Sequence, residues 1–176
     1  MAIHVCPLPA LGERMAKSRA THLLSVMGPN DMIDPWPGLE PDRHCRVTVN
    51  DIVEASDGLV LAGEAHVTQI IDFARVWARA GTDRRPLIIH CWAGISRSTA
   101  AAYIALCALN AKKDEREIAR ALRDVAPFAK PNGRLIEVAD EVLNRKGRMC
   151  GAISDLPEAQ WLANGVPFHL PANMSA

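Results

Sequence analysis

Short apolar segments alternate along the chain with longer segments in which apolar residues recur at intervals of three or four. The short segments are bounded by Gly, Pro or polar residues, and several are rich in β-branched side chains, which is typical of strands. We predict strands over residues 3–6, 23–27, 45–49 and 86–91. The last of these is apolar up to His90, which indicates a buried strand.

The longer segments predict helices. They cover residues 8–20, 64–80, 98–111, 114–125 and 132–145. In the second of these the apolar residues form one stripe, and Gly81 supplies a stop signal. The third is apolar almost all round, so we expect it in the core. Strands and helices in this order favour an α/β fold, with a central sheet of four or five strands flanked by helices.

Two segments lie outside this pattern. Residues 28–43 hold four prolines and three aspartates, which predicts a surface loop. The aspartates lack the spacing of a Ca²⁺-binding loop and do not indicate a metal site. From residue 146 onward the chain is rich in Gly and Pro. We therefore expect one domain over residues 1–145 and a tail of uncertain order over residues 146–176.

Composition and charge exclude several functions. With 176 residues, of which 49% are apolar, the chain can form one domain with a core. Lys and Arg together number 20, as do Asp and Glu, so no excess of positive charge indicates nucleic-acid or membrane binding. The sequence has no apolar run of membrane-spanning length and nothing that resembles a signal peptide. The five cysteines are irregularly spaced, so we expect a reduced, cytoplasmic protein that needs no metal or cofactor.

The segment from His90 to Ser98 carries the candidate chemistry, because it joins a buried strand to a buried helix. Such a loop turns several main-chain N–H groups toward one point, with the helix dipole behind them, and this arrangement binds phosphate. Gly94 allows the main chain to curl closely. The same field stabilises a thiolate, so Cys91 at the end of the strand is a candidate nucleophile. Arg97 could hold two phosphate oxygens with its planar guanidinium group.

His90 and Cys91, followed after five residues by Arg97 and Ser98, resemble the signature of the cysteine-based protein tyrosine phosphatases. The compact loop is similar to that of the dual-specificity branch and of small bacterial tyrosine-phosphatase-like proteins. The resemblance extends over about residues 45–143 and implies a compact phosphatase-type domain. It implies a phosphocysteine intermediate on Cys91. It also implies that Arg97 binds phosphate, that Ser98 helps to expel the thiolate and that His90 orders the loop.

The resemblance further implies a phosphate-binding loop, a general acid and a bracing asparagine. The residues that would bind phosphate together with the arginine are Trp92, Ala93, Gly94, Ile95 and Ser96. The acid of this family is an aspartate that follows a strand and precedes the helix before the signature, and both Asp51 and Asp57 fit. We favour Asp51, because Asp57 stands before Gly58 in a sequence typical of a plain turn. Asn132 matches the asparagine that starts a helix and braces the loop.

These features predict a phosphate-monoester hydrolase, either a protein tyrosine phosphatase or a dual-specificity enzyme. Its partner would be a phosphorylated protein or a small phosphoester. The loop residues 92–96 contain no lysine, which favours a singly phosphorylated substrate such as phosphotyrosine over a phosphoinositide. Rhodanese-like sulfur transfer, arsenate reduction and a catalytically silent phosphate-binding module are the alternatives.

The sequence leaves the roles of Cys6, Cys45 and Trp92 open. Cys6 and Cys45 both lie in predicted strands, and either could form a protective disulfide with Cys91. Trp92 either lines the rim of the pocket or packs beneath the loop. The histidines other than His90 are scattered along the chain and indicate no site.

Overall fold

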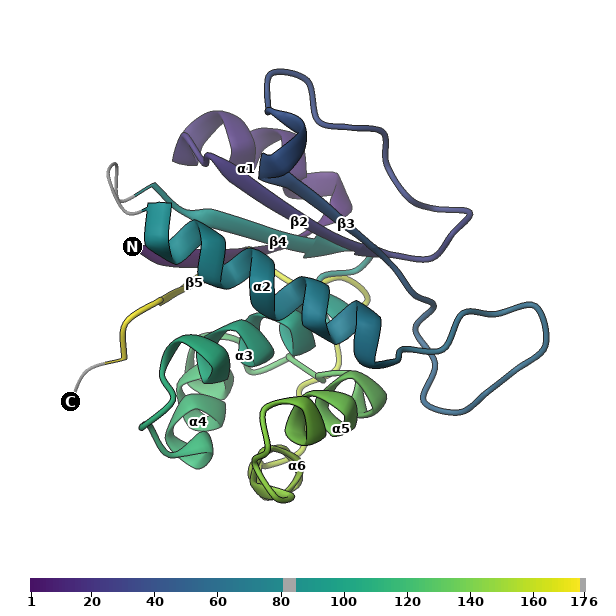
Figure 1. Ribbon diagram of the computed structural model, residues 1–176, viewed down its shortest axis with the longest axis vertical. Helices are drawn as coiled ribbons and strands as arrows, with labels where there is room; N and C mark the ends of the chain where they lie inside the picture. The colour runs from purple at the N-terminus through teal and green to yellow at the C-terminus, as the bar shows by residue number, and fades with distance from the viewer. Residues whose placement is uncertain (81–84, 175–176) are drawn as a thin grey trace.

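The computed structural model describes residues 1–80 and 85–174 and contains one five-stranded sheet (Figure 1). The strands are β1 (Ala2–Pro7), β2 (His22–Met27), β3 (His44–Thr48), β4 (Leu87–Cys91) and β5 (Phe168–Pro171). Their order across the sheet is β3-β2-β4-β1-β5. The first four are parallel, and β5 pairs antiparallel with β1. The predicted α/β class and the size of the sheet are confirmed, and Gly81 lies outside the described residues.

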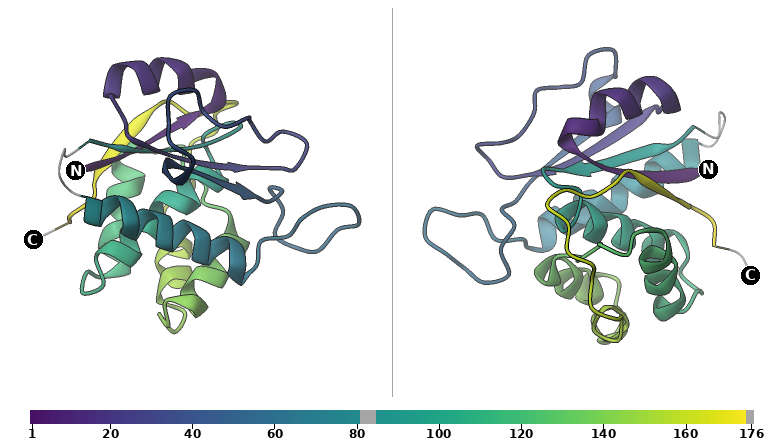
Figure 2. Two further views of the ribbon diagram at one scale, coloured as in Figure 1. Left: turned by 45° about the horizontal axis from the view of Figure 1, so that its top comes forward. Right: turned by 180° about the vertical axis from the view of Figure 1, so that it is seen from behind.

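Six α-helices in the described part of the chain cover the two faces of the sheet unequally. They are α1 (Leu11–Ser18), α2 (Glu64–Ala80), α3 (Arg97–Leu109), α4 (Glu115–Val125), α5 (Gly133–Val142) and α6 (Arg148–Ser154). Helix α1 lies alone on one face, and the other five form a thick layer on the opposite face (Figures 1 and 2). Two short 3₁₀ turns, Leu8–Ala10 and Pro41–Arg43, precede α1 and β3.

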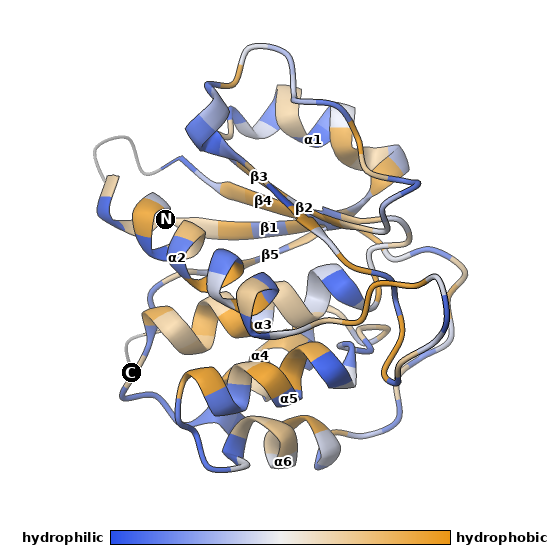
Figure 3. Ribbon diagram, turned by 45° about the vertical axis from the view of Figure 1, so that its right-hand side comes forward, coloured by the Kyte–Doolittle hydropathy of each residue, from blue (hydrophilic) through white to orange (hydrophobic). Residues whose placement is uncertain are grey.

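The main core lies between the sheet and the layer of α2–α6 (Figure 3). Helix α3 is buried over most of its length, as its uniformly apolar sequence predicts. Five of its residues are alanines, and such small side chains let the helix pack closely against β4 and β1. Helix α3 begins a short loop after the end of β4, at Arg97. Because both elements are packed in the core, they hold the loop between them in a fixed position.

A second, smaller core lies under α1. It contains Cys6, Leu11, Leu23 and Ile88. The Pro-rich segment 28–43, predicted as a surface loop, is largely exposed but sends three apolar side chains into this core. They are Ile33, Trp36 and Leu39. The segment is thus anchored to the α1 face of the sheet.

The segment that follows residue 145, whose order the sequence left open, contains α6 and β5. Met149 and Ala152 of α6 are buried in the main core, as are Phe168 and Leu170 of β5. The strand forms the edge of the sheet beside β1, and the main-chain N–H of Ala172 donates to the carbonyl of Met1. No helix within the described ranges is long and apolar enough to cross a membrane.

Candidate active site

The loop between β4 and α3 bends sharply at Gly94, whose φ is +70°. A Cβ atom at this position would lie 2.7 Å from the main-chain N of Pro7 in β1. Both the left-handed φ and the close approach of β1 require glycine here. The loop therefore curls tightly over the end of the sheet, as the sequence predicts.

Four carbonyl groups of this loop point outward and accept hydrogen bonds from the surrounding main chain. The N–H of Leu8 donates to Trp92 O at 3.0 Å, and that of Gly165 donates to Ala93 O at 2.7 Å. The other two donors are Lys130 N, at 3.0 Å from Ile95 O, and Asn132 N, at 3.4 Å from Ser96 O. Three separate segments of the chain thus hold the loop from behind.

The outward carbonyls fix the direction of the N–H groups. In a trans peptide unit the C=O of one residue and the N–H of the next point in opposite directions. The N–H groups of residues 93, 94, 96 and 97 must therefore point into the loop. The N–H of Gly94 donates to Cys91 Sγ at 3.3 Å, in agreement with this direction. Together with the N-terminus of α3, these donors form a site for an anion.

The thiol of Cys91 lies at the centre of this arrangement. Cys91 is 2% exposed, and its Sγ lies 3.1 Å from the Oγ of Ser98 in the first turn of α3. The sulfur accepts a hydrogen bond from the Gly94 N–H and lies within hydrogen-bonding distance of the Ser98 hydroxyl. The structure thus brings together Cys91, Gly94 and Ser98, which the sequence grouped in one site.

Arg97 is a buried cation at the same site. Its Nη1 donates to Val49 O at 3.1 Å, which anchors the guanidinium group to the end of β3. Its Nε is buried and makes no hydrogen bond within the described residues, and Asp51 Oδ2 lies 3.8 Å away. A buried guanidinium N–H without an acceptor is costly. An anion in the loop would supply the acceptor.

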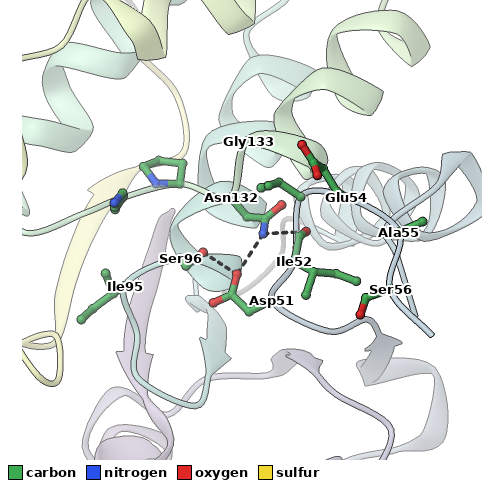
Figure 4. A pocket seen from close by; sticks show the side chains of 12 residues that line it. Asp51, Ile52, Glu54, Ala55, Ser56, Ile95, Ser96, Asn132 and Gly133 are labelled. Atoms are coloured by element: carbon green, nitrogen blue, oxygen red, sulfur yellow. Dashed lines mark hydrogen bonds between the residues drawn. The ribbon is translucent and has the colours of Figure 1, made fainter. Parts of the chain in front are cut away.

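Asp51 follows β3 and extends its carboxylate toward the loop (Figure 4). Its Oδ1 accepts hydrogen bonds from Ser96 Oγ at 2.6 Å and from Asn132 Nδ2 at 2.9 Å. The amide oxygen of Asn132 also caps α5 by accepting from Leu135 N at 3.0 Å. Asp57, the rival aspartate, lies in an exposed turn and lines neither cavity that Asp51 borders.

Cys91 and Asp51 border one cavity of about 460 Å³. Its lining includes Cys91, Arg97, Asp51, Trp92 and Asp31. Trp92 is 55% exposed, so it lies at the rim and does not pack beneath the loop. A second cavity, of about 650 Å³, adjoins the first through Asp51 and extends along the loop 51–56 (Figure 4). The described residues contain no group of three His, Cys, Asp or Glu side chains able to hold a metal ion.

Comparison of sequences finds no matching family model and no matching curated protein. Comparison of structures finds similarity to crystal structures of phosphatases. DUSP15 matches with a TM-score of 0.59 and 19% identity, over 89% of this chain and 94% of that one. Human DUSP28 matches with a TM-score of 0.60 and 20% identity, over 82% of this chain and 89% of that one. The chain has the dual-specificity phosphatase fold.

A third structure with this phosphatase fold is that of PTPMT1 in complex with PI(5)P. It matches with a TM-score of 0.59 and 15% identity, over 80% of this chain and 88% of that one. These identities are low, so the similarity concerns the arrangement of the elements. The residues of the site are therefore judged by their own geometry.

Behind the loop of this phosphatase fold, three side chains from adjacent strands form a hydrogen-bonded chain that the sequence did not predict. Ser25 Oγ in β2 lies 2.6 Å from His90 Nε2 in β4 and 2.9 Å from His44 Nε2 in β3. The N–H of Trp36 donates to His44 Nδ1 at 3.0 Å. His44, which indicated no site in the sequence, is buried and connects the Pro-rich segment to the loop.

The main-chain donor at Trp36 determines the tautomers of this chain. Because His44 Nδ1 accepts from a main-chain N–H, neutral His44 carries its proton on Nε2 and donates to Ser25. Ser25 then donates its single proton to His90 Nε2, and His90 carries its own proton on Nδ1. Burial lowers the pKa of both His44 and His90 to about 4, so both rings are neutral near pH 7.

The strand geometry of the phosphatase fold does not favour Cys6 or Cys45 as a disulfide partner of Cys91. All five cysteines are free. Cys6 is paired in register with His90 and faces the smaller core under α1. Adjacent residues in a strand point to opposite faces of the sheet, so Cys91 points away from the face that Cys6 occupies. Cys45 lies in β3, which β2 separates from β4. Burial raises the pKa of Cys6 to about 12 and that of Cys45 to about 11, so neither forms a thiolate readily.

Proposed function

We propose that the chain is a cysteine-dependent phosphatase that hydrolyses phosphate monoesters through a phosphocysteine intermediate. The supporting observation is the convergence of inward-pointing N–H groups and a buried Arg97 on the Sγ atom of Cys91. Phosphoryl transfer spreads negative charge over three equatorial oxygens, and a ring of fixed donors stabilises that charge.

In the first step, Cys91 Sγ attacks phosphorus and the bond from phosphorus to the ester oxygen breaks. Asp51 protonates the leaving oxygen. Its Oδ1 is held by Ser96 and Asn132, so its Oδ2 is the oxygen left to carry the proton. Arg97 binds the transferring phosphoryl group while its Nη1 remains attached to Val49.

In the second step, Asp51 accepts a proton from water, and the water oxygen attacks the phosphocysteine. The S–P bond breaks and phosphate leaves. Ser98, whose Oγ lies 3.1 Å from Cys91 Sγ, keeps its proton and donates a hydrogen bond to the departing thiolate, which stabilises it. The cycle returns Cys91 as a thiolate and Asp51 as an acid without any redox change.

For the substrate, we propose phosphotyrosine in proteins, with phosphoserine and phosphothreonine as the alternative that a dual-specificity enzyme accepts. The side chains at 92–96 include no cation that could bind a further phosphate. PTPMT1, which has the same fold, was crystallised with PI(5)P. A phosphoinositide is therefore the competing substrate class for this chain.

The test is hydrolysis of p-nitrophenyl phosphate in EDTA. Wild type should turn over and Cys91→Ser should be inactive. Asp51→Ala should lose about 10²–10⁴-fold in kcat, the usual contribution of a general acid. Asp57→Ala is the matched control, because its carboxylate lies in an exposed turn away from the cavity, and it should retain the wild-type rate.

Three outcomes would contradict this proposal. A folded wild type that binds vanadate without turnover would be a phosphate-binding module. Consumption of thiosulfate or arsenate in place of the phosphoester would indicate sulfur transfer or arsenate reduction. Activity of Cys91→Ser equal to wild type would exclude the phosphocysteine intermediate.

A further inference from the structure

A third cavity, of about 370 Å³, lies between the signature loop and the segment that follows α6. We call it the flanking cleft. Its lining is mainly apolar and includes Ile95, Phe128, Pro131, Leu156, Trp161 and Leu162. None of these side chains takes part in the chemistry described above.

The flanking cleft lies next to the phosphate pocket. Ile95 of the signature loop lines both cavities. The main-chain N–H of Lys130 donates to Ile95 O at 3.0 Å, so the far wall of the cleft is attached to the same loop. A substrate whose phosphate is bound at Cys91 therefore has its neighbouring atoms at Ile95, at the entrance to the cleft.

The wall of the flanking cleft is held in place before any ligand binds. The N–H of Gln160 donates to Pro127 O at 3.0 Å. Arg123 donates through Nη1 to Pro157 O and through Nη2 to Ala129 O, the latter at 3.0 Å. The charge of Arg123 is thus directed at main-chain carbonyls. A preformed cleft binds a ligand without the entropic cost of ordering its own wall.

Two exposed side chains in the flanking cleft suit a ligand of defined chemistry. Trp161 is 86% exposed, although large aromatic side chains are usually packed. Lys130 is exposed and forms no ion pair with any described residue. An apolar group against Trp161 and an anionic group at Lys130 would match this surface.

We propose that the flanking cleft binds the residues next to the phosphorylated side chain of a protein substrate, an apolar residue against Trp161 and an acidic residue at Lys130. This inference rests on the proposed function and adds a substrate preference to it. The position of the cleft beside the phosphate pocket favours a peptide over a second copy of the chain, because one extended substrate could reach both cavities across Ile95. A small phosphoester would reach only the first.

The test measures binding of labelled phosphotyrosine peptides to the Cys91→Ser protein by fluorescence polarisation, so that turnover is not needed. Three peptides carry the flanks Asp-Leu, Lys-Leu or Asp-Ala symmetrically on both sides of the phosphotyrosine. The Leu-to-Ala change should weaken binding about fivefold or more, as the loss of a partly buried side chain predicts. Trp161→Ala should abolish this difference between the Leu and Ala peptides.

Charge reversal supplies a readout that misfolding cannot mimic. Glu158 lines the flanking cleft itself, and Asp31 and Glu54 line the adjoining cavities, so the useful quantity is the ratio of affinities for the Asp and Lys peptides. Lys130→Glu should shift this ratio toward the Lys peptide by about fivefold or more. Lys112→Glu, beyond the opposite end of α3, is the matched control and should leave the ratio unchanged.

Equal affinity for all three peptides, or a ratio that Lys130→Glu does not change, would overturn the inference. Either result is compatible with turnover of p-nitrophenyl phosphate, so the proposed function would stand. Flank-dependent binding by a protein that hydrolyses nothing would support the inference and contradict the proposed function.

Discussion

At the scale of single residues, the candidate site depends on a few side chains around the loop between β4 and α3. The sequence alone could group Cys91, Arg97 and Ser98, because the three residues lie close together in the segment 91–98. Asp51 could be proposed because it follows a predicted strand, although only the structure distinguishes its position from the exposed turn of Asp57. Ser25 could not be found, since its contact with His90 spans 65 positions and depends on the order of the strands.

The Ser25 hydroxyl is predicted to stabilise the fold as well as the loop. Ser25→Ala leaves two buried imidazole nitrogens without a partner. The free energy of unfolding should fall by about 1–3 kcal/mol, the usual cost of unsatisfied buried polar groups. Urea unfolding at pH 7 measures this loss. Ser154→Ala, at the exposed end of α6, is the control and should change it little, and an equal effect of both substitutions would contradict the role of Ser25.

At the scale of elements, the loop is held by three segments that are distant in sequence. They are the turn after β1, the segment before α5 and the segment before β5. The first two segments adjoin strands or helices that the sequence predicted. The third could not be predicted, because β5 is four residues long and ends in proline, so it has almost no periodicity to detect.

Gly165 is the contact of this third segment, and its replacement should disturb the site from behind. A Cβ at residue 165 would lie 2.7 Å from both Gly94 O and a ring carbon of Phe128. Gly165→Ala should lower the Tm and weaken vanadate binding about tenfold or more, since the loop must shift to relieve the contact. Thermal unfolding with and without vanadate measures both effects.

The chain offers a matched control for this substitution. Gly151 lies in α6 with open space around its Cα, so Gly151→Ala should stabilise the protein by about 0.4–1 kcal/mol. Vanadate affinity that is the same in both variants and in wild type would show that the segment before β5 does not support the loop.

For the whole molecule, the histidines determine how stability depends on pH. Burial lowers the pKa of His4, His22, His44 and His90 below the usual value of 6.5. For His44 and His90 it falls to about 4. At pH values between the lowered pKa of about 4 and the usual pKa of 6.5, the unfolded chain binds more protons than the folded protein. In this range the free energy of unfolding rises with pH. The free energy of unfolding should therefore decrease as the pH falls from 7 to 5.

Urea unfolding at several pH values tests this expectation. His44→Gln should flatten the dependence on pH even if it lowers stability at every pH, because one titrating ring is removed. A free energy of unfolding that stays constant between pH 7 and pH 5 would contradict the burial of the neutral imidazoles.

The pairing of β1 with β5 also has a consequence for protein synthesis. Strand β1 is synthesised before β5, so one of its edges stays open until residue 171 has emerged. Until then the phosphate-binding loop lacks the Gly165 contact behind it. A nascent chain therefore exposes an unpaired strand edge, of the kind that chaperones protect from aggregation. Under the proposed function, phosphatase activity should therefore begin only after residue 171 has been translated.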